Sequence, residues 1–440
     1  MKRGTGKTVA VSLLTALLVS ACGGNADKGA GNPEPVNDKG AAEVKETSYP
    51  PAKLVIYSTS GWTEEVFNER FGNAIKAKFP QHTFEYIQWK NGTRYPDLIA
   101  SKQEIDIVWE SIAKFASGPL AFNMQMDMTE LMKTHKVDTS RIEPTLMDLM
   151  REMSGGKMYA LPVQNNTTVL YYNKDIFDKF GVSYPKNGMT WDEVFELNKR
   201  LTRTDGNVQY VGLAMQHYFP TNSLSLGYVD LKTEKPTISS EKWRSLYEVY
   251  GKLAEPQGYK DKIRAGKKIP EVISFVKDKD VAMLAALANT HMTQDMSSMN
   301  WDVVSMPVFK EAPQTGPQGY PTYFGVSAIS KNKDQSMEVI KYLISDEFQL
   351  SVSKTGALPV VNTKEIKDAF AKDTNFSSKN VKVAFYEKFA PIAPKTMYDP
   401  GVESAYNKNI ISYALGEMDL NTLLRQAEEA ATKSIADQKK

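Results

Sequence analysis

The chain has 440 residues, and its 54 lysines and arginines nearly balance its 52 aspartates and glutamates. Without residues 1–21 the balance is 51 basic to 52 acidic residues, which excludes an electrostatic case for binding nucleic acid or an anionic membrane surface. The only cysteine is Cys22, which excludes an intrachain disulfide and a thiolate metal cluster. About 390 residues follow the N-terminal region, enough for two domains of usual size.

The N-terminus has the pattern of an export signal. Three basic residues precede an uncharged run from Val9 to Val19, which is too short to cross the roughly 30 Å core of a bilayer as a permanent helix. The run ends in Val19-Ser20-Ala21-Cys22, which resembles the bacterial lipobox. We therefore expect a signal peptide over residues 1–21, a lipid (palmitate or a similar acyl chain) on Cys22, and a flexible tether over residues 22–51. The protein would be held by its lipid alone at the extracytoplasmic face of the cell membrane.

The first half of the body predicts alternating strands and helices. Short apolar runs at Lys53–Tyr57, Thr83–Ile87 and Ile105–Trp109 are typical of buried strands. Between the first two runs, Thr63 can cap a helix whose apolar residues recur as far as Phe79. Strands that alternate with helices favour a mixed α/β layer with parallel pairing.

The pattern restarts in the middle of the chain. Tyr159–Val163 and Thr168–Tyr172 are strand-like, and Thr190 and Glu193 match a capping box. Further strands are expected at Val211–Met215, Trp301–Met306 and Tyr323–Ile329, and helices after Asp280, over Val339–Phe348 and over Thr422–Ile435.

Several segments resemble the motifs of one known family, in the same order. Gly156–Pro162 (GKMYALP) and Leu170–Phe177 (LYYNKDIF) are similar to its YALP and YNKDLF motifs, and Thr190–Glu193 to its TWDE. Later matches are Asp280–Met283, Gly325–Lys331, Gly356–Pro359 and Ala414–Gly416. Together these segments resemble the family 1 extracellular solute-binding proteins of ABC importers, of which the maltose-binding protein is the best-known member.

The resemblance implies a two-lobe periplasmic-binding-protein fold of type II, α/β in class, with a cleft between lobes joined by crossover strands. The first crossover should lie near Gln164–Val169 and the second near Phe324–Ser327. The expected lobes are discontinuous, with lobe 1 over residues 52–164 plus 325–370 and lobe 2 over residues 165–324 plus 371–440. The implied function is that of a monomeric substrate-binding lipoprotein without cofactor, which captures a small polar solute, a mono- or oligosaccharide, for the permease subunits of an ABC importer.

A cleft that recognises a sugar needs amides, carboxylates and aromatic rings where strands end, the usual binding edge of an α/β sheet. Side chains of these types follow predicted strands in both halves. Candidate ligand-binding residues are Ser58, Ser60, Trp62, Glu110, Asn165, Asn166, Gln216, Tyr218, Asn289, Tyr320 and Tyr323. Trp109 suits the core as well as the cleft, and Trp191 and Trp243 are expected in the core.

This chain differs from the family at one position, where many members carry an aromatic ring that stacks on a sugar. Many members carry an aromatic residue after the segment that matches Asp280–Met283, whereas this chain has Leu284–Thr290 (LAALANT) there. Two ligand classes therefore stay open. One is an oligosaccharide bound through other side chains, and the other is a different polar solute.

The alternative class is an extracellular hydrolase that acts on cell-wall or polysaccharide material. Ser111–Lys114 fits S-x-x-K, Ser298–Asn300 fits S-x-N, and Lys354–Gly356 fits K-T-G, while a carboxylate pair with Glu110 would suit glycoside hydrolysis. S-x-x-K also occurs at Ser154–Lys157 and Ser351–Lys354, and the K-T-G follows a helical segment, so we predict no catalysis. We also predict no metal site, because Thr204–Asn207 holds only one acid.

Overall fold

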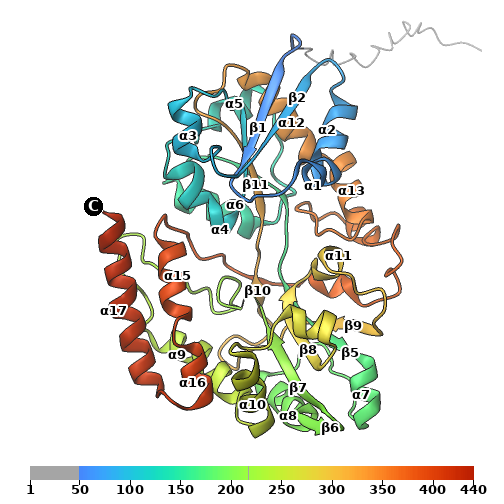
Figure 1. Cartoon of the computed structure of the whole chain (residues 1–440). Coiled ribbons are helices and arrows are strands. Elements are labelled where there is room, and N and C mark those ends of the chain that lie inside the picture. Colours follow the sequence, from blue (N-terminus) through green and yellow to red (C-terminus); the bar gives the residue numbers. More distant parts are fainter. Residues whose placement is uncertain (1–48, 217) are drawn as a thin grey trace, which may run out of the picture. The chain divides into compact units, whose positions relative to one another are not determined.

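The computed structural model describes residues 49–216 and 218–440. The predicted signal peptide, Cys22, most of the predicted tether and His217 lie outside the described residues. The rest of the chain forms two five-stranded sheets, in the strand orders β2-β1-β3-β11-β4 and β6-β7-β8-β5-β9 (Figure 1). We call the part built on the first sheet lobe 1 and the part built on the second lobe 2. The predicted α/β two-lobe fold is confirmed.

In the sheet of lobe 1, four strands run in one direction and one strand, β11, runs against them. Strand β1 (Lys53–Ser58) pairs in parallel with β2 (Thr83–Gln88) and β3 (Ile107–Ser111). Strand β11 (Thr322–Val326) runs antiparallel between β3 and β4 (Leu161–Gln164). Because β11 lies between two strands from much earlier in the chain, lobe 1 is built from two separate pieces of sequence.

The first helical segment of lobe 1 begins as predicted. The hydroxyl of Thr63 accepts a hydrogen bond from the Val66 amide at 3.4 Å, and Phe67, Phe71 and Ile75 are buried at four-residue spacing. This segment comprises α1 (Glu64–Phe67), a π-helical turn over Asn68–Gly72, and α2 (Asn73–Lys78). The other helices of lobe 1 are α3 (Tyr95–Ala100), α4 (Ile112–Phe115), a π-helical turn over Ala116–Leu120, α5 (Thr129–Thr134), α6 (Pro144–Met153), α12 (Lys333–Leu343), α13 (Asp346–Lys354) and α14 (Lys364–Asp368).

One predicted helix of lobe 1 is two helices in the structure. The expected helix over Val339–Phe348 is interrupted between α12 and α13, where the hydroxyl of Ser345 accepts a hydrogen bond from the Phe348 amide. A serine that caps a new helix ends the old one, because its extended backbone cannot continue the first helix.

The sheet of lobe 2 corrects the prediction of a helix after Asp280. Strand β8 (Val281–Leu287) lies between β7 (Val208–Met215) and β5 (Thr168–Asn173), parallel to the first and antiparallel to the second. Both faces of such a central strand are covered, so its sequence shows an unbroken apolar run without alternation. Strands β9 (Trp301–Val304) and β6 (Arg203–Asp205) form the edges.

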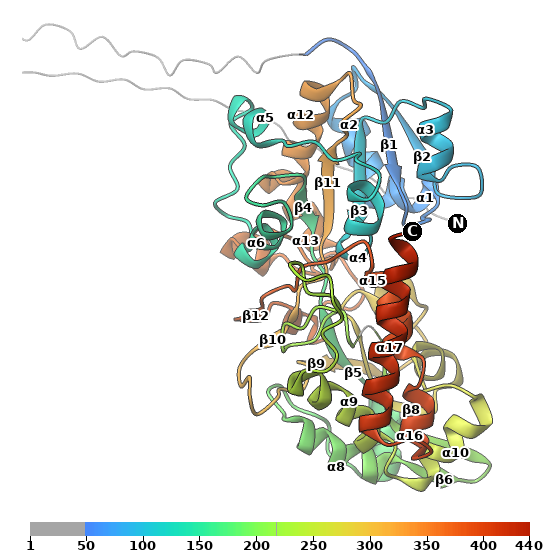
Figure 2. The same cartoon turned by 90° about the vertical axis from the view of Figure 1, so that its left-hand side faces the viewer.

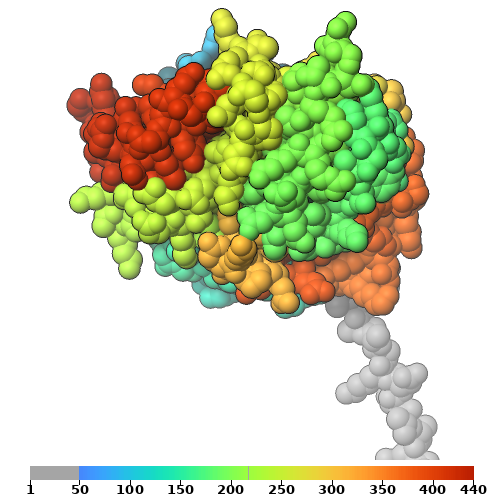
Figure 3. Space-filling view, turned by 90° about the horizontal axis from the view of Figure 1, so that it is seen from below, coloured from blue at the N-terminus to red at the C-terminus, as the bar shows by residue number. Residues whose placement is uncertain are grey.

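Helices from the middle and the end of the chain cover lobe 2. The predicted capping box is confirmed, since Thr190 and Glu193 bond reciprocally at the start of α8. The last helices pack on α9 and α10, and Figure 3 shows the red C-terminal segment beside the yellow-green one. The helices of lobe 2 are α7 (Lys174–Phe180), α8 (Trp191–Leu201), α9 (Glu241–Leu253), α10 (Gln257–Gly266), a π-helical turn over Ser274–Asp278, α11 (Thr290–Thr293), a 3-10 turn over Val381–Ala384, α15 (Asp399–Asn407), α16 (Ile410–Leu415) and α17 (Leu420–Gln438).

Strand membership locates the crossings between the sheets. The first lies where predicted, because β4 ends at Gln164 in one sheet and β5 begins at Thr168 in the other. The second does not lie at Phe324–Ser327, because all of β11 pairs within lobe 1. It precedes Thr322, in the stretch that also forms β10 (Gly316–Gln318), which pairs with β12 (Phe389–Ala390). The position Phe324–Ser327 is the one that the family resemblance implies, and the pairing of β11 with β3 and β4 corrects it.

No helix among the described residues is long and apolar enough to pass through a bilayer.

Candidate functional site

The carboxyl ends of the parallel strands of lobe 1 surround a hollow. Loops that follow β1, β2 and β3 supply its walls, with the start of α3 on one side. Its volume is about 970 Å³, open to solvent, and its lining residues are Thr59, Ser60, Gly61, Trp89, Arg94, Tyr95, Pro96, Lys114, Ser117 and Phe122. This is the edge of an α/β sheet at which ligands usually bind.

Glu110 lies behind the hollow and holds the loop that follows β1. Its carboxylate accepts hydrogen bonds from the Thr59 amide at 2.5 Å and from the Ser58 hydroxyl at 3.4 Å, and the Ser58 and Ser60 hydroxyls are 2.6 Å apart. The side chain of Glu110 is 0 % exposed, and burial raises its pKa to about 8 against the lowering effect of these hydrogen bonds. Glu110 is thus a positioning group for the loop, and Ser60 is the member of the predicted set that lines the hollow.

Two exposed tryptophans stand at this edge. Trp62 is 40 % and Trp89 39 % exposed, and Trp89 lines the hollow while Trp62 does not. The guanidinium of Arg94 lies 5.6 Å from the Trp89 ring centre. Trp109, by contrast, is buried in the core of lobe 1 against Phe71 and Phe324. Trp89 was missed although it lies two residues after the predicted strand Thr83–Ile87, and Trp62 and Glu110 were selected because they follow predicted strands.

One buried hydroxyl group at the hollow lacks a partner within the described part of the chain. The Tyr95 hydroxyl is buried and makes no hydrogen bond there, whereas the Thr59 hydroxyl interacts with the Glu110 carboxyl group, and both residues line the hollow. A buried polar atom without a partner costs about 1–3 kcal/mol. A ligand with its own hydroxyl groups could supply the missing partner of Tyr95.

The matching edge of lobe 2 lies after β7 and β8. Gln216 and Asn289 follow these strands and are half-buried. Tyr218 is only 5 % exposed and packs against Trp191 and Tyr250 in the core of lobe 2. The structure therefore places Gln216 and Asn289 at the edge and Tyr218 beneath it.

The crossing segments join the two edges. The side-chain amide of Asn166 donates to Oδ1 of Asn289 at 2.8 Å, and the Tyr320 amide donates to the Asn166 carbonyl oxygen at 2.7 Å. Asn165 is buried, and its Oδ1 has no partner among the residues described. Tyr323 differs from the other predicted residues here, because its side chain is buried and its hydroxyl donates to the Leu146 carbonyl oxygen at 2.6 Å. The alternation of β11 directs Tyr323 into the core of lobe 1.

Sequence reasoning missed a buried charged cluster at the start of α15. Lys395 and Asp399 are each 5 % exposed, and neither the Lys395 ammonium nor Oδ2 of Asp399 has a hydrogen-bond partner within the described part. Burial lowers the pKa of Lys395 and raises those of Asp399 and Glu403. Lys114 of lobe 1 is close enough to act on the Glu403 carboxylate, and α15 lies next to α4 in two perpendicular views (Figures 1 and 2). Lys395, Asp399 and Glu403 are four residues apart along one segment, but their approach to Lys114 arises only in the fold, so no local sequence signal identifies it.

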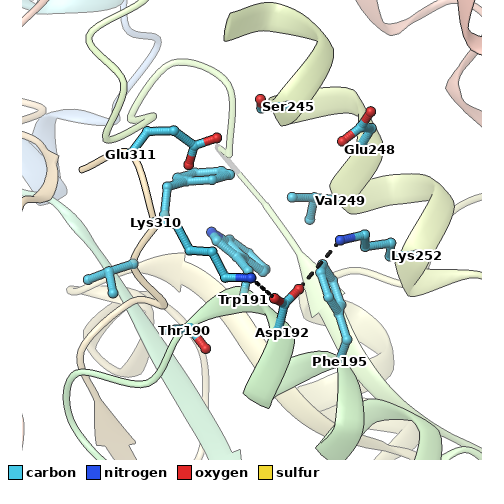
Figure 4. A pocket seen from close by; sticks show the side chains of 12 residues that line it. Thr190, Trp191, Asp192, Phe195, Ser245, Glu248, Val249, Lys252, Lys310 and Glu311 are labelled. Atoms are coloured by element: carbon cyan, nitrogen blue, oxygen red, sulfur yellow. Dashed lines mark hydrogen bonds and ion pairs between the residues drawn. The ribbon is translucent and has the colours of Figure 1, made fainter. Parts of the chain in front are cut away.

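A second hollow on lobe 2 contains none of the predicted residues. Its floor is formed by Trp191, Phe195 and other apolar side chains between α8 and α9. Figure 4 shows Asp192 between Lys310 and Lys252, with nitrogen–oxygen distances of 2.6 and 3.4 Å. Its central carboxylate is therefore already matched by two cations of the chain.

The three hydrolase motifs lie on different elements. Ser111 ends β3 in lobe 1, and Ser298 precedes β9 in lobe 2. Lys354 ends α13, and Gly356 has a φ of 83°, so the Lys-Thr-Gly segment forms a helix end, as expected, where a hydrolase needs a strand.

Comparisons with known proteins agree with this architecture. The family model of the bacterial extracellular solute-binding proteins matches residues 58–350. The sn-glycerol-3-phosphate-binding periplasmic protein UgpB of Brucella melitensis is 24% identical over 242 residues, 51% of this chain and 54% of that protein. Two solved structures share the fold at 19% identity. They are a sugar transporter from Rhizobium etli in an open conformation (TM-score 0.67, 86% of this chain and 99% of that one) and the ABC substrate-binding protein Lmo0181 from Listeria monocytogenes in complex with cycloalternan (TM-score 0.66, 88% and 99%).

Proposed function

Because the chain belongs to the bacterial extracellular solute-binding protein family, we propose that it captures a mono- or oligosaccharide between its lobes and delivers it to the permease of an ABC importer. One observation carries the proposal. The carboxyl edge of lobe 1 presents an exposed tryptophan, Trp89, beside the buried Tyr95 hydroxyl, which lacks a partner in the described part of the chain. Aromatic faces and unsatisfied hydroxyls are the two kinds of group that a sugar engages at once.

The chemistry of a pyranose ring suits this edge. Its apolar C–H face would stack on Trp89, and its hydroxyls would bond to Ser60, Tyr95 and Ser117. From lobe 2, Gln216 and Asn289 would supply amide donors and acceptors. The names of the structural neighbours, a sugar transporter and a cycloalternan complex, support a carbohydrate ligand.

Capture would be signalled by the arrangement of the lobes. A solute that touches both edges binds better when they are close together, so it shifts the population toward a closed form that the permease recognises. In this scheme the protein acts as a monomer and leaves the solute chemically unchanged.

We also propose that the protein is anchored by a lipid on Cys22 and works outside the cytoplasm. The proposal rests on the lipobox-like Val19–Cys22. The substitution Cys22→Ala should release the protein from membranes into the soluble fraction. If the substituted protein stays with the membranes, the anchor lies elsewhere.

The ligand proposal is tested by a thermal-shift screen over mono- and oligosaccharides with product analysis of each mixture. We expect a rise in melting temperature with at least one sugar and recovery of that sugar unaltered. Trp89→Ala should weaken binding about tenfold, or about 1.4 kcal/mol, while Trp89→Phe should retain most of the affinity. Tyr184→Ala removes an aromatic ring of similar exposure on lobe 2 and should leave affinity unchanged. Absence of any hit, or conversion of the sugar, would overturn the proposal.

A further inference from the structure

Positive charge distinguishes the hollow of lobe 1. Arg94 and Lys114 are the only charged residues that line it, and neither forms an ion pair with a carboxylate of residues 49–216 or 218–440. The hollow of lobe 2 is different, because there Asp192 is matched by Lys252 and Lys310 (Figure 4). Two cations that form no ion pair make the lobe 1 hollow a place where an anion would be attracted.

Arg94 is held at the hollow by its neighbours. Its guanidinium lies over Trp89 at 5.6 Å and donates to Oδ1 of Asn91 at 3.1 Å. A planar guanidinium that rests on an aromatic face keeps donors free for a carboxylate or phosphate. The same tryptophan that would stack on a sugar ring therefore also positions a cation beside it.

The buried Tyr95 hydroxyl at the hollow provides a second, independent sign of a ligand. The Tyr95 side chain is 2 % exposed and its hydroxyl has no partner among the described residues, whereas the Thr59 hydroxyl interacts with the Glu110 carboxyl group. An anionic oxygen accepts several hydrogen bonds at once, and bonds to a charged acceptor are stronger than bonds between neutral groups. Such an acceptor would satisfy the Tyr95 hydroxyl.

Two carboxyl groups face Lys114 and set the electrostatic balance. Glu110 is buried behind the Thr59 amide, and Glu403 faces Lys114 from lobe 2. Neither lines the hollow. Glu110 is held by the backbone, and Glu403 interacts with Tyr228 and Lys395. An anion in the hollow would therefore contact the two cations that line it and not the two carboxyl groups.

We propose that the solute carries an anionic group, a carboxylate or a phosphate, on its polyhydroxylated body, and that Lys114 and Arg94 bind this group. The inference rests on the proposed function and specifies its substrate class. Trp89 would stack on the apolar face of the body, and the Tyr95 hydroxyl would donate to the anionic group.

Calorimetric titration of the purified protein with matched ligands tests the inference. The probes are D-glucose, D-glucuronate and D-glucose 6-phosphate, then glycerol and sn-glycerol 3-phosphate, then maltose and digalacturonate. We expect an acidic member to bind at least about tenfold more tightly than its neutral counterpart, with a preference that falls as salt is added. The carboxylate and phosphate ligands are titrated separately, so the result identifies which anionic group is bound.

Substitutions test whether Lys114 causes the preference for the acidic ligand. Lys114→Gln should reduce the preference for the acidic ligand about tenfold, and Glu403→Gln, which removes the opposing carboxylate, should increase it. Lys102→Gln changes an exposed lysine at the other end of α3 that does not line the hollow, and should have no effect. Equal or tighter binding of the neutral members would overturn the inference and leave the proposed function intact. The inference also fails if only sugars of the wider screen bind, whereas failure of that whole screen rejects the proposed function itself.

Discussion

The two lobes present their carboxyl edges in different ways. At the edge of lobe 1, short loops follow the strands directly, and Trp62 and Trp89 keep about two fifths of their surface exposed. At the edge of lobe 2, the segment after β7 turns inward, and Tyr218 and Phe219 join the core. Lobe 1 therefore offers rings and cations on a preformed surface, whereas lobe 2 offers amides and a buried charged cluster.

This difference shows that the length of the segment after a strand decides whether the side chains at the strand end are exposed or buried. Only five residues separate β1 from α1, and only six separate β2 from α3, so Trp62 and Trp89 stay exposed there. The segment from Gln216 to the start of α9 at Glu241 has enough apolar residues to build its own part of the core. The aromatic residues that follow these strands are therefore exposed where the loop is short and buried where it is long.

The largest predicted effect concerns the buried carboxyl group of lobe 1, that of Glu110. Burial favours its uncharged form, and Glu110 has a pKa of about 8 in the folded chain against an ordinary value of 4.5. Its contribution to stability is complete below the ordinary value and is lost as pH rises through 8. Glu110→Gln keeps an acceptor for the Thr59 amide but does not ionise. Between pH 5 and 8.5 the substituted protein should gain stability over the natural chain, at most about 5 kcal/mol.

Urea unfolding at each pH measures this difference. Glu64→Gln, an exposed position in the first turn of α1, serves as the matched control and should leave the pH dependence unchanged. Parallel curves for Glu110→Gln and the natural chain would show that Glu110 is ionised in the fold throughout this range.

A second test separates the two cores. Trp109 lies in the core of lobe 1 and Trp243 in that of lobe 2, and both are almost fully buried. Replacing either with alanine should cost about 3–5 kcal/mol. Because the cores share no residue, each loss should fall mainly on its own lobe. Hydrogen exchange should show amides of β1 and β3 less protected in Trp109→Ala, and amides of β7 and β8 in Trp243→Ala. Equal loss in both sheets from either change would mean that the lobes unfold as one unit.

Local patterns predicted the parts of the fold that depend on neighbouring residues. Thr63 and Thr190 cap helices because the cap involves groups within three residues. The early strands of lobe 1 and the position of Ser60 at the binding edge follow from short apolar runs ended by polar residues. Trp89 could have been predicted by the same reasoning, because it occupies the first position after β2.

Features that depend on distant segments could not be predicted in this way. The run of β8 resembles a helix until its neighbours β5 and β7 are known to cover both of its faces. Tyr323 precedes an apolar run as a cleft residue would, yet its hydroxyl bonds to the Leu146 carbonyl oxygen, 177 positions away. Lys395 and Glu403 reach the binding edge only because the C-terminal segment returns beside α4.

The smallest expected effect concerns the connection between the lobes. The Asn166 amide donates to Oδ1 of Asn289 at 2.8 Å, which ties the first crossing to the edge of lobe 2. Asn289→Ala removes the acceptor and leaves the Asn166 amide able to bond to water, so stability should fall by about 1 kcal/mol. If this tie aligns the crossing for closure, affinity for the best sugar of the screen should fall about fivefold in calorimetry. Asn300→Ala removes an exposed amide bond to Asp175 within lobe 2 and should cost similar stability without any loss of affinity. Equal losses of affinity from both substitutions would place the role of Asn289 in the general stability of lobe 2, and the two lobes would then be coupled through their edges alone.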